Sequence, residues 1–146
     1  MAKTTKLNFD EERKQIQDRQ RALITEIKAK RAAHTRSRLS FDKATRNLQL
    51  VEGQTTMLIR DQLLQDPNAL VMPGPGGTSE NWFWSVLRTR LQQHPAVVEA
   101  SAAVQRAQET TIMAEQEVLD LSDEWGMLHD HARLLAARMQ YGASEV

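Results

Sequence analysis

The residues with the greatest capacity for chemistry are four histidines, and their spacing argues against a metal site. The chain contains His34, His94, His129 and His131 but no cysteine. His129 and His131 are two residues apart, so on a helix they point to different sides, whereas metal-binding helices use i,i+3 or i,i+4 pairs. A Glu-x-x-His pair, which marks di-iron helical bundles, does not occur. We therefore predict no metal ion and no cofactor.

The stretch Gly74-Pro75-Gly76-Gly77 is the only part of the chain that resembles a phosphate-binding loop, and it lacks the required residues. It has no Gly-Lys-Ser/Thr ending, no strand is expected before it, and its proline removes a backbone donor. The Ser and Thr residues are scattered over polar positions and suggest no nucleophile–base pair. We predict that the protein is not an enzyme and has no catalytic residues.

Charge is divided unequally along the chain. Residues 1–60 contain 14 Lys and Arg against 7 Asp and Glu, whereas residues 61–146 contain 5 against 12. A basic run, Lys28–Arg46, contains Lys30 and six further cations that are the candidate nucleic-acid contacts: Lys28, Arg31, Arg36, Arg38, Lys43 and Arg46. These residues suit either of two roles. They contact nucleic-acid phosphates, or they pair with the acidic segment Glu109–Glu124 and are otherwise simply solvated. No zinc-finger spacing, helix-turn-helix or aromatic stacking platform accompanies them.

Most of the aromatic mass lies in three consecutive residues, Trp82, Phe83 and Trp84. Three successive residues span about 200° of a helix, so they cannot all pack against one neighbouring helix. Either the three rings belong to a core or self-association contact, or one ring faces outward as an anchor for a protein partner. Tryptophan is typical of such binding anchors.

These residues are positioned by two long helical arms that follow a heptad pattern. Residues 9–65 contain no proline, and their apolar residues recur at steps of four and three. This first seam comprises Ile16, Leu23, Ile27, Phe41, Ala44, Leu48, Val51 and Leu58. The second arm, residues 95–141, keeps the pattern for about six heptads. Its seam comprises Val97, Ala100, Val104, Ala107, Thr111, Ala114, Val118, Leu121, Trp125, Leu128, Ala132, Leu135 and Met139.

Prolines divide the remainder of the chain. Asp66-Pro67 ends the first arm, because proline disfavours helical geometry in the residue before it. Residues 66–78 are predicted as an irregular connector and residues 79–93 as a short helix, which Pro95 separates from the second arm. We predict a single all-α domain over residues 1–146, a long antiparallel two-helix coiled-coil hairpin with a short extra helix after the turn.

The opposite charges of the arms favour the antiparallel arrangement. A turn near Met72 and Pro73 predicts that facing residues have numbers that sum to roughly 145, which brings Arg31 close to Glu115. Two helices cover only one side of each seam, so we also predict a homodimer that forms a helical bundle.

No membrane contact is expected. The first residues are not followed by an apolar stretch, and no run approaches the roughly 18 apolar residues of a membrane span. We predict a cytoplasmic location.

The order of elements after the first arm resembles that of small coiled-coil proteins of phages and mobile elements. It is carried by Gly77, Leu87, Leu91, His94-Pro95, Ala100, Ala107, Ala114-Glu115 and Leu121. The resemblance implies a phage-type protein in the host cytoplasm with an accessory role in DNA recombination or replication. Trp82-Phe83-Trp84 departs from that pattern, since such proteins usually have polar residues there. From the residues themselves we expect an adaptor that binds a protein partner, and as the alternative a nucleic-acid-associated protein.

Overall fold

The computed structural model describes the backbone of residues 2–66 and 79–144 and the side chains of residues 8–66 and 81–141. These residues form three α-helices and no strand: α1 (Ala2–Gln65), α2 (Ser79–Gln93) and α3 (Pro95–Ser144). Most of the predicted connector, including the glycine-rich stretch, lies outside the described residues. Among the described helices, none combines the length and the apolar character needed to cross a membrane.

The junction of α2 and α3 shows how the sequence ends one helix and starts the next. The backbone N–H of His94 donates to the carbonyl of Leu91 at 3.3 Å, which closes α2 with a tightened turn. Pro95 is then the first residue of α3, where its missing N–H costs nothing. The imidazole Nδ1 of His94 accepts a hydrogen bond from the N–H of Ala96 at 3.2 Å, and so acts as the N-terminal cap of α3.

The internal contacts divide the chain into two compact units, which are described separately. The first unit contains Met1–Arg36 and Ile112–Val146, and the second contains Ser37–Thr111. Both α1 and α3 therefore contribute to each unit. The prediction of a single domain over residues 1–146 stays a prediction.

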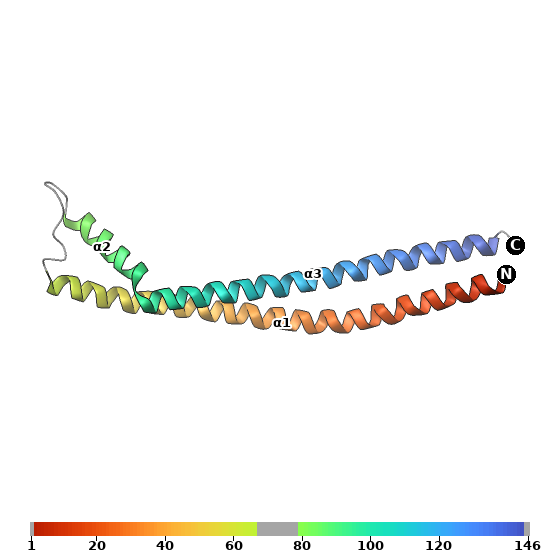
Figure 1. The fold of residues 1–146 in the computed structure, drawn as a ribbon, viewed down its shortest axis with the longest axis horizontal. Coiled ribbons are helices and arrows are strands. Elements are labelled where there is room, and N and C mark those ends of the chain that lie inside the picture. The colour runs from red at the N-terminus through yellow and green to blue at the C-terminus, as the bar shows by residue number, and fades with distance from the viewer. Residues whose placement is uncertain (1, 67–78, 145–146) are drawn as a thin grey trace. The chain divides into compact units, whose positions relative to one another are not determined.

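In the first unit, α1 and α3 pack as an antiparallel pair. The start of α1 lies beside the end of α3, as the red and blue ribbons of Figure 1 show. Arg19 pairs with Glu124 and Lys30 with Glu117, so the residue numbers fall on α3 as they rise on α1. The residue numbers of the two pairs add up to 143 and 147, close to the predicted sum of roughly 145. The predicted register is therefore confirmed for this unit. Its buried side chains are Ile16, Leu23 and Leu135.

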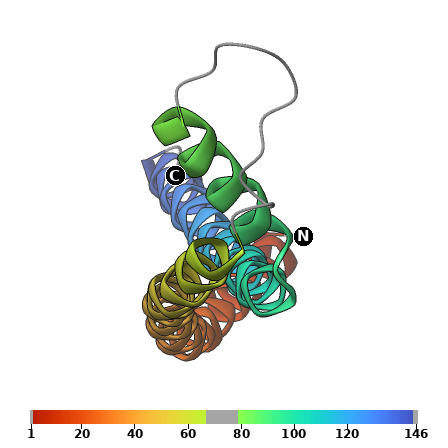
Figure 2. The same cartoon turned by 90° about the vertical axis from the view of Figure 1, so that its left-hand side faces the viewer.

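The second unit contains a small core to which α2 contributes. Ile59 and Leu63 of α1 form a buried cluster with Leu87 of α2. Phe83, Val86 and Leu91 pack against this cluster. Figure 2 views this unit end-on, with α2 in green and the last turns of α1 in yellow-green. Thr55, Val97 and Ala100 are also buried.

The predicted seams agree with the observed burial except at one residue. All thirteen seam residues of α3 are buried or half-buried. In α1 the prediction of Leu58 is wrong, since that side chain is 50% exposed, and Ile59 and Leu63 are buried instead. After Val51 the covered positions advance in steps of four, through Thr55 to Ile59 and Leu63. Repeated steps of four turn the covered stripe around the helix, so a strict heptad no longer follows it.

Candidate interaction surfaces

The three aromatic residues of α2 occupy three different environments in the second unit. Phe83 packs against the cluster of Ile59, Leu63 and Leu87. Trp84 is 52% exposed, and its ring meets that of Phe83 edge to face, with centroids 5.6 Å apart and an interplanar angle of 82°. Of the two interpretations left open by the sequence, the structure contains elements of both, because one ring is in the core and the next faces outward.

Trp82 is half-buried and carries an unusual polar group. Its indole Nε1 is buried and has no hydrogen-bond partner among the described residues. A buried donor without an acceptor costs about 1–3 kcal/mol, because the hydrogen bond it makes with water in the unfolded chain is not replaced. A partner that supplied an acceptor to this N–H would therefore gain more binding free energy than a partner that supplied an acceptor to an exposed donor, which already binds water.

The six cations of the predicted basic run are all exposed: Lys28, Arg31, Arg36, Arg38, Lys43 and Arg46. Within the described part of the chain, none of the six takes part in an ion pair. The first three belong to the first unit and the last three to the second unit. The six side chains are therefore accessible to solvent or to an anionic partner, while Lys30, which lies in the same stretch of sequence, pairs with Glu117 of the acidic segment.

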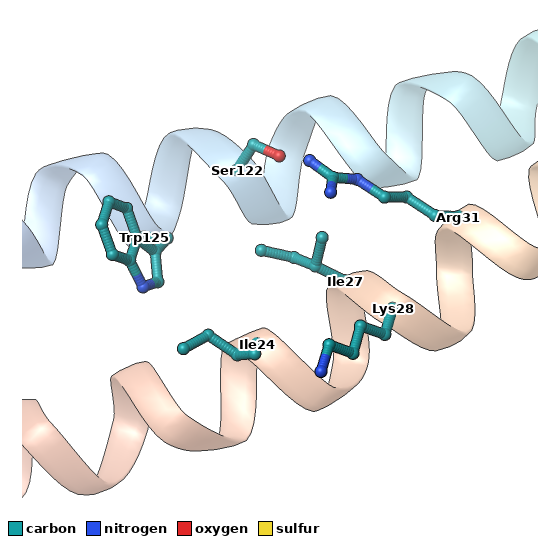
Figure 3. Close-up of a pocket in the computed structure, with 6 residues that line it drawn as sticks. All are labelled: Ile24, Ile27, Lys28, Arg31, Ser122 and Trp125. Atoms are coloured by element: carbon teal, nitrogen blue, oxygen red, sulfur yellow. The ribbon is translucent and has the colours of Figure 1, made fainter.

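One hollow in the first unit brings two of these cations together with apolar side chains. It has a volume of about 310 Å³ and is lined by Ile24, Ile27, Lys28 and Arg31 of α1 and by Ser122 and Trp125 of α3. Figure 3 shows Ile27 and the long side chain of Arg31 extending from α1 toward α3, with Trp125 on the far wall. We call this feature the Ile24 groove.

The ion pairs between the two helices lie elsewhere in the first unit. The Arg19 guanidinium donates to both carboxylate oxygens of Glu124, at 2.9 and 3.1 Å, and Lys30 Nζ lies 2.8 Å from Glu117 Oε2. The hydrogen bond to Glu124 raises the pKa of Arg19, and the hydrogen bond to Glu117 raises the pKa of Lys30. Both cations therefore stay charged throughout the neutral range.

The predicted proximity of Arg31 and Glu115 does not produce an ion pair among the described residues. Arg31 instead lines the Ile24 groove. Lys30, its neighbour in sequence, makes the contact to α3 and uses Glu117. The register was predicted correctly. Which carboxylate a cation contacts depends in addition on the side of the helix–helix interface on which its side chain lies.

The histidines hold structural positions. His129 stacks on Trp125, with centroids 5.3 Å apart and an interplanar angle of 9°. His94 caps α3, and His34 is half-buried on the seam of α1. Within residues 8–66 and 81–141, no three His, Asp or Glu side chains gather closely enough to hold a metal ion.

The sequence correctly places Trp125 on the seam, where it is half-buried, but its stacking with His129 was not predicted. The spacing of Trp125 and His129, four residues apart, was the available signal, since i,i+4 aromatic rings on a helix can stack. Two of the six residues that line the Ile24 groove, Ile24 and Ser122, were not singled out, and Ile24 lies one position away from the predicted seam residue Leu23.

No known protein family, no curated protein and no solved structure matches this chain. The resemblance to phage and mobile-element coiled-coil proteins therefore stays a prediction, and the functional argument rests on the surfaces described above.

Proposed function

We propose that this chain is a non-enzymatic helical adaptor that binds a protein partner through the aromatic residues of α2. The observation that carries the proposal is the placement of Trp84, which is 52% exposed while the adjacent Phe83 is fixed in a core cluster. Tryptophan is among the residue types that most often dominate the binding energy of protein–protein interfaces.

The support for this role lies in rigidity as well as exposure. The edge-to-face contact with Phe83 restricts the ring of Trp84 before any partner arrives. A pre-positioned ring loses little conformational entropy on binding, so more of its apolar burial appears as affinity. The indole N–H of the neighbouring Trp82, which has no acceptor within residues 8–66 and 81–141, adds a donor that a partner can satisfy if it brings an acceptor and opens the site.

The test is quantitative affinity purification from the source cells with the Trp84→Ala variant. We expect the partner to be lost, because truncation of a binding anchor costs about 2 kcal/mol or more, roughly 30-fold in Kd. Leu39→Ala is the matched control, since Leu39 is 64% exposed and belongs to the same unit. Equal recovery with both variants would contradict the proposal. A loss of helicity in Trp84→Ala would instead assign this ring to the core.

A second candidate function is nucleic-acid association through the basic run. It is favoured by the six exposed cations, none of which is paired within the described residues. Such contacts release counterions, so binding falls steeply with salt. The accessory role in phage-type DNA recombination or replication belongs to this candidate.

Retention on an oligonucleotide column tests this alternative. We expect the triple variant Lys28→Glu, Arg36→Glu, Lys43→Glu to elute at lower salt than a control triple with the same change in charge. Lys14→Glu, Arg21→Glu, Arg106→Glu serves as that control, because these cations are exposed but lie outside the run. The alternative is excluded if the unaltered protein passes through the column at low salt.

A further inference from the structure

The Ile24 groove combines accessible apolar surface with two cations, and its lining contains no acidic residue. Ile24 is 45% exposed, and the walls formed by Ile27 and Trp125 are only half-buried. Lys28 and Arg31 border these walls and take part in no ion pair of the described residues. The groove therefore offers an apolar floor with a positive rim.

Positively charged side chains also line a second hollow next to the Ile24 groove in the first unit. A second hollow of about 240 Å³ is lined by Arg13, Gln17, Gln20, His129, Ala132, Arg133, Leu135 and Ala136. The stacked pair of Trp125 and His129 joins the two hollows, because Trp125 lines one and His129 lines the other. Neither lining contains an acidic residue.

Two further hollows of this unit differ from these, because their linings include acidic side chains. One is lined by Glu26, Lys30, Glu117 and Asp120 together with Ala29 and Leu121, and the other includes Glu12 and Arg19. The cations among them are already used, since Lys30 pairs with Glu117 and Arg19 with Glu124 and Glu26. The two hollows that contain Trp125 and His129 thus have cations and no carboxylate in their linings, whereas the linings of the other two include carboxylates.

We propose that the Ile24 groove is the docking site for an amphipathic helix of a protein partner, with Asp and Glu residues flanking the apolar face of that helix. A helix laid into a groove between two helices buries its apolar residues on the floor and its flanking charges at the rim. Lys28 and Arg31 select acidic flanks, because charges of opposite sign favour encounter and like charges oppose it. This surface does not include Trp84, so the proposal is independent of the proposed function.

Two other occupants fit the groove less well. A second copy of this chain that used the same groove would bring two basic rims together, and the repulsion opposes a symmetric contact. Nucleic acid would contact Lys28 and Arg31 through its phosphates but would leave the apolar area of Ile24 and Ile27 uncovered. A helix is the occupant that uses both parts of the groove.

The probe is a pair of designed helical peptides tested on the unaltered protein by fluorescence anisotropy. Both carry leucines at positions i, i+3, i+4 and i+7, and they differ only in having Glu or Lys at the flanking positions. We expect the Glu peptide to bind at least about 10-fold more tightly than the Lys peptide, since like charges at a rim cost several kcal/mol. A Glu peptide with scrambled leucines should not bind.

Variants locate the site. Lys28→Glu, Arg31→Glu should reverse the preference of the two peptides, whereas the control Lys14→Glu, Arg21→Glu should leave it unchanged. Ile24→Ala should weaken the Glu peptide roughly 10-fold by removing apolar contact area. Leu119→Ala is its control, because Leu119 is 50% exposed in the same unit but lines neither hollow.

The proposal is overturned if the unaltered protein binds both peptides equally or neither peptide at millimolar concentration. It is also overturned if Lys28→Glu, Arg31→Glu abolishes oligonucleotide binding while the two peptides show no difference, since the rim would then serve phosphates. A dimer that dissociates on the same substitution would assign the groove to a second copy. The peptide comparison on the unaltered protein decides the question even if a variant fails to fold.

Discussion

Leu58 and Leu63 of α1 are the same residue type, five positions apart, in very different surroundings. Leu63 has no exposed surface and belongs to the cluster that includes Ile59 and Leu87, whereas Leu58 is 50% exposed. Removing a buried leucine leaves a cavity as well as losing apolar burial. The side chain of Leu63 therefore contributes to stability, and that of Leu58 lies largely in solvent.

We expect Leu63→Ala to lower the free energy of unfolding by about 2–5 kcal/mol. Leu58→Ala should change it by no more than about 0.5 kcal/mol, as is usual for surface positions. Urea denaturation followed by circular dichroism measures both. If Leu58→Ala proves the more damaging change, the strict heptad would be right and the observed shift of the seam wrong.

At the scale of single residues, the sequence predicts which residues are candidates for binding or for the core, but it does not predict the direction in which each side chain points. That the three rings of Trp82, Phe83 and Trp84 cannot share one environment follows from helix geometry alone. Which ring enters the core depends on the rotation of α2 about its axis, and that rotation is set by tertiary contacts of Leu87 and Leu91 with α1. Short-range sequence patterns contain no such information.

At the scale of the helices, the helix-breaking prolines predict well where the helices end and begin. Gln65 ends α1 just before Asp66-Pro67, and Pro95 begins α3. The short helix was predicted over residues 79–93, and α2 covers Ser79–Gln93. The start of the first arm was predicted too late, at about residue 9, although residues 1–8 contain no proline or glycine. The structure begins α1 at Ala2.

A second apolar stripe on α1 was not predicted. Leu50, Met57 and Leu64 repeat every seven residues in the second unit and are 60%, 69% and 63% exposed. Gly53 lies between the first two, and a side chain built there would meet no atom within 4 Å. The stripe is symmetric about Met57, so two copies related by a two-fold axis at this residue would place leucine against leucine.

The predicted homodimer would use this stripe. We expect the unaltered protein to have the mass of a dimer in light scattering at micromolar concentration and Met57→Glu to shift it toward the monomer, because a buried unpaired carboxylate opposes association. Met113→Glu is the control, since Met113 is 66% exposed but lies in the other unit. A monomer at every concentration would contradict the prediction.

At the scale of the whole chain, the unequal charge of the two halves correctly indicates that α1 and α3 run antiparallel where they pair in the first unit. Among the described residues, the ion pairs between the two helices are Arg19 with Glu124 and Lys30 with Glu117, so most of the charged side chains are not paired across the interface. The division into two units was not predicted, because both helices pass through it with no proline, glycine cluster or change of composition near residues 36 and 112.

The thin interior of the first unit ties its stability to its occupancy. Among its described side chains, only Ile16, Leu23 and Leu135 are buried, so the free energy that keeps α1 and α3 together there is small and backbone amides should exchange with deuterium readily. A ligand that covers Ile24 and Trp125 adds to that free energy through mass action, by about 2.7 kcal/mol at a hundredfold excess over Kd. When a ligand saturates the groove, the first measurable effect should thus be slower exchange of backbone amides with deuterium in α1 and α3, without a change in their secondary structure.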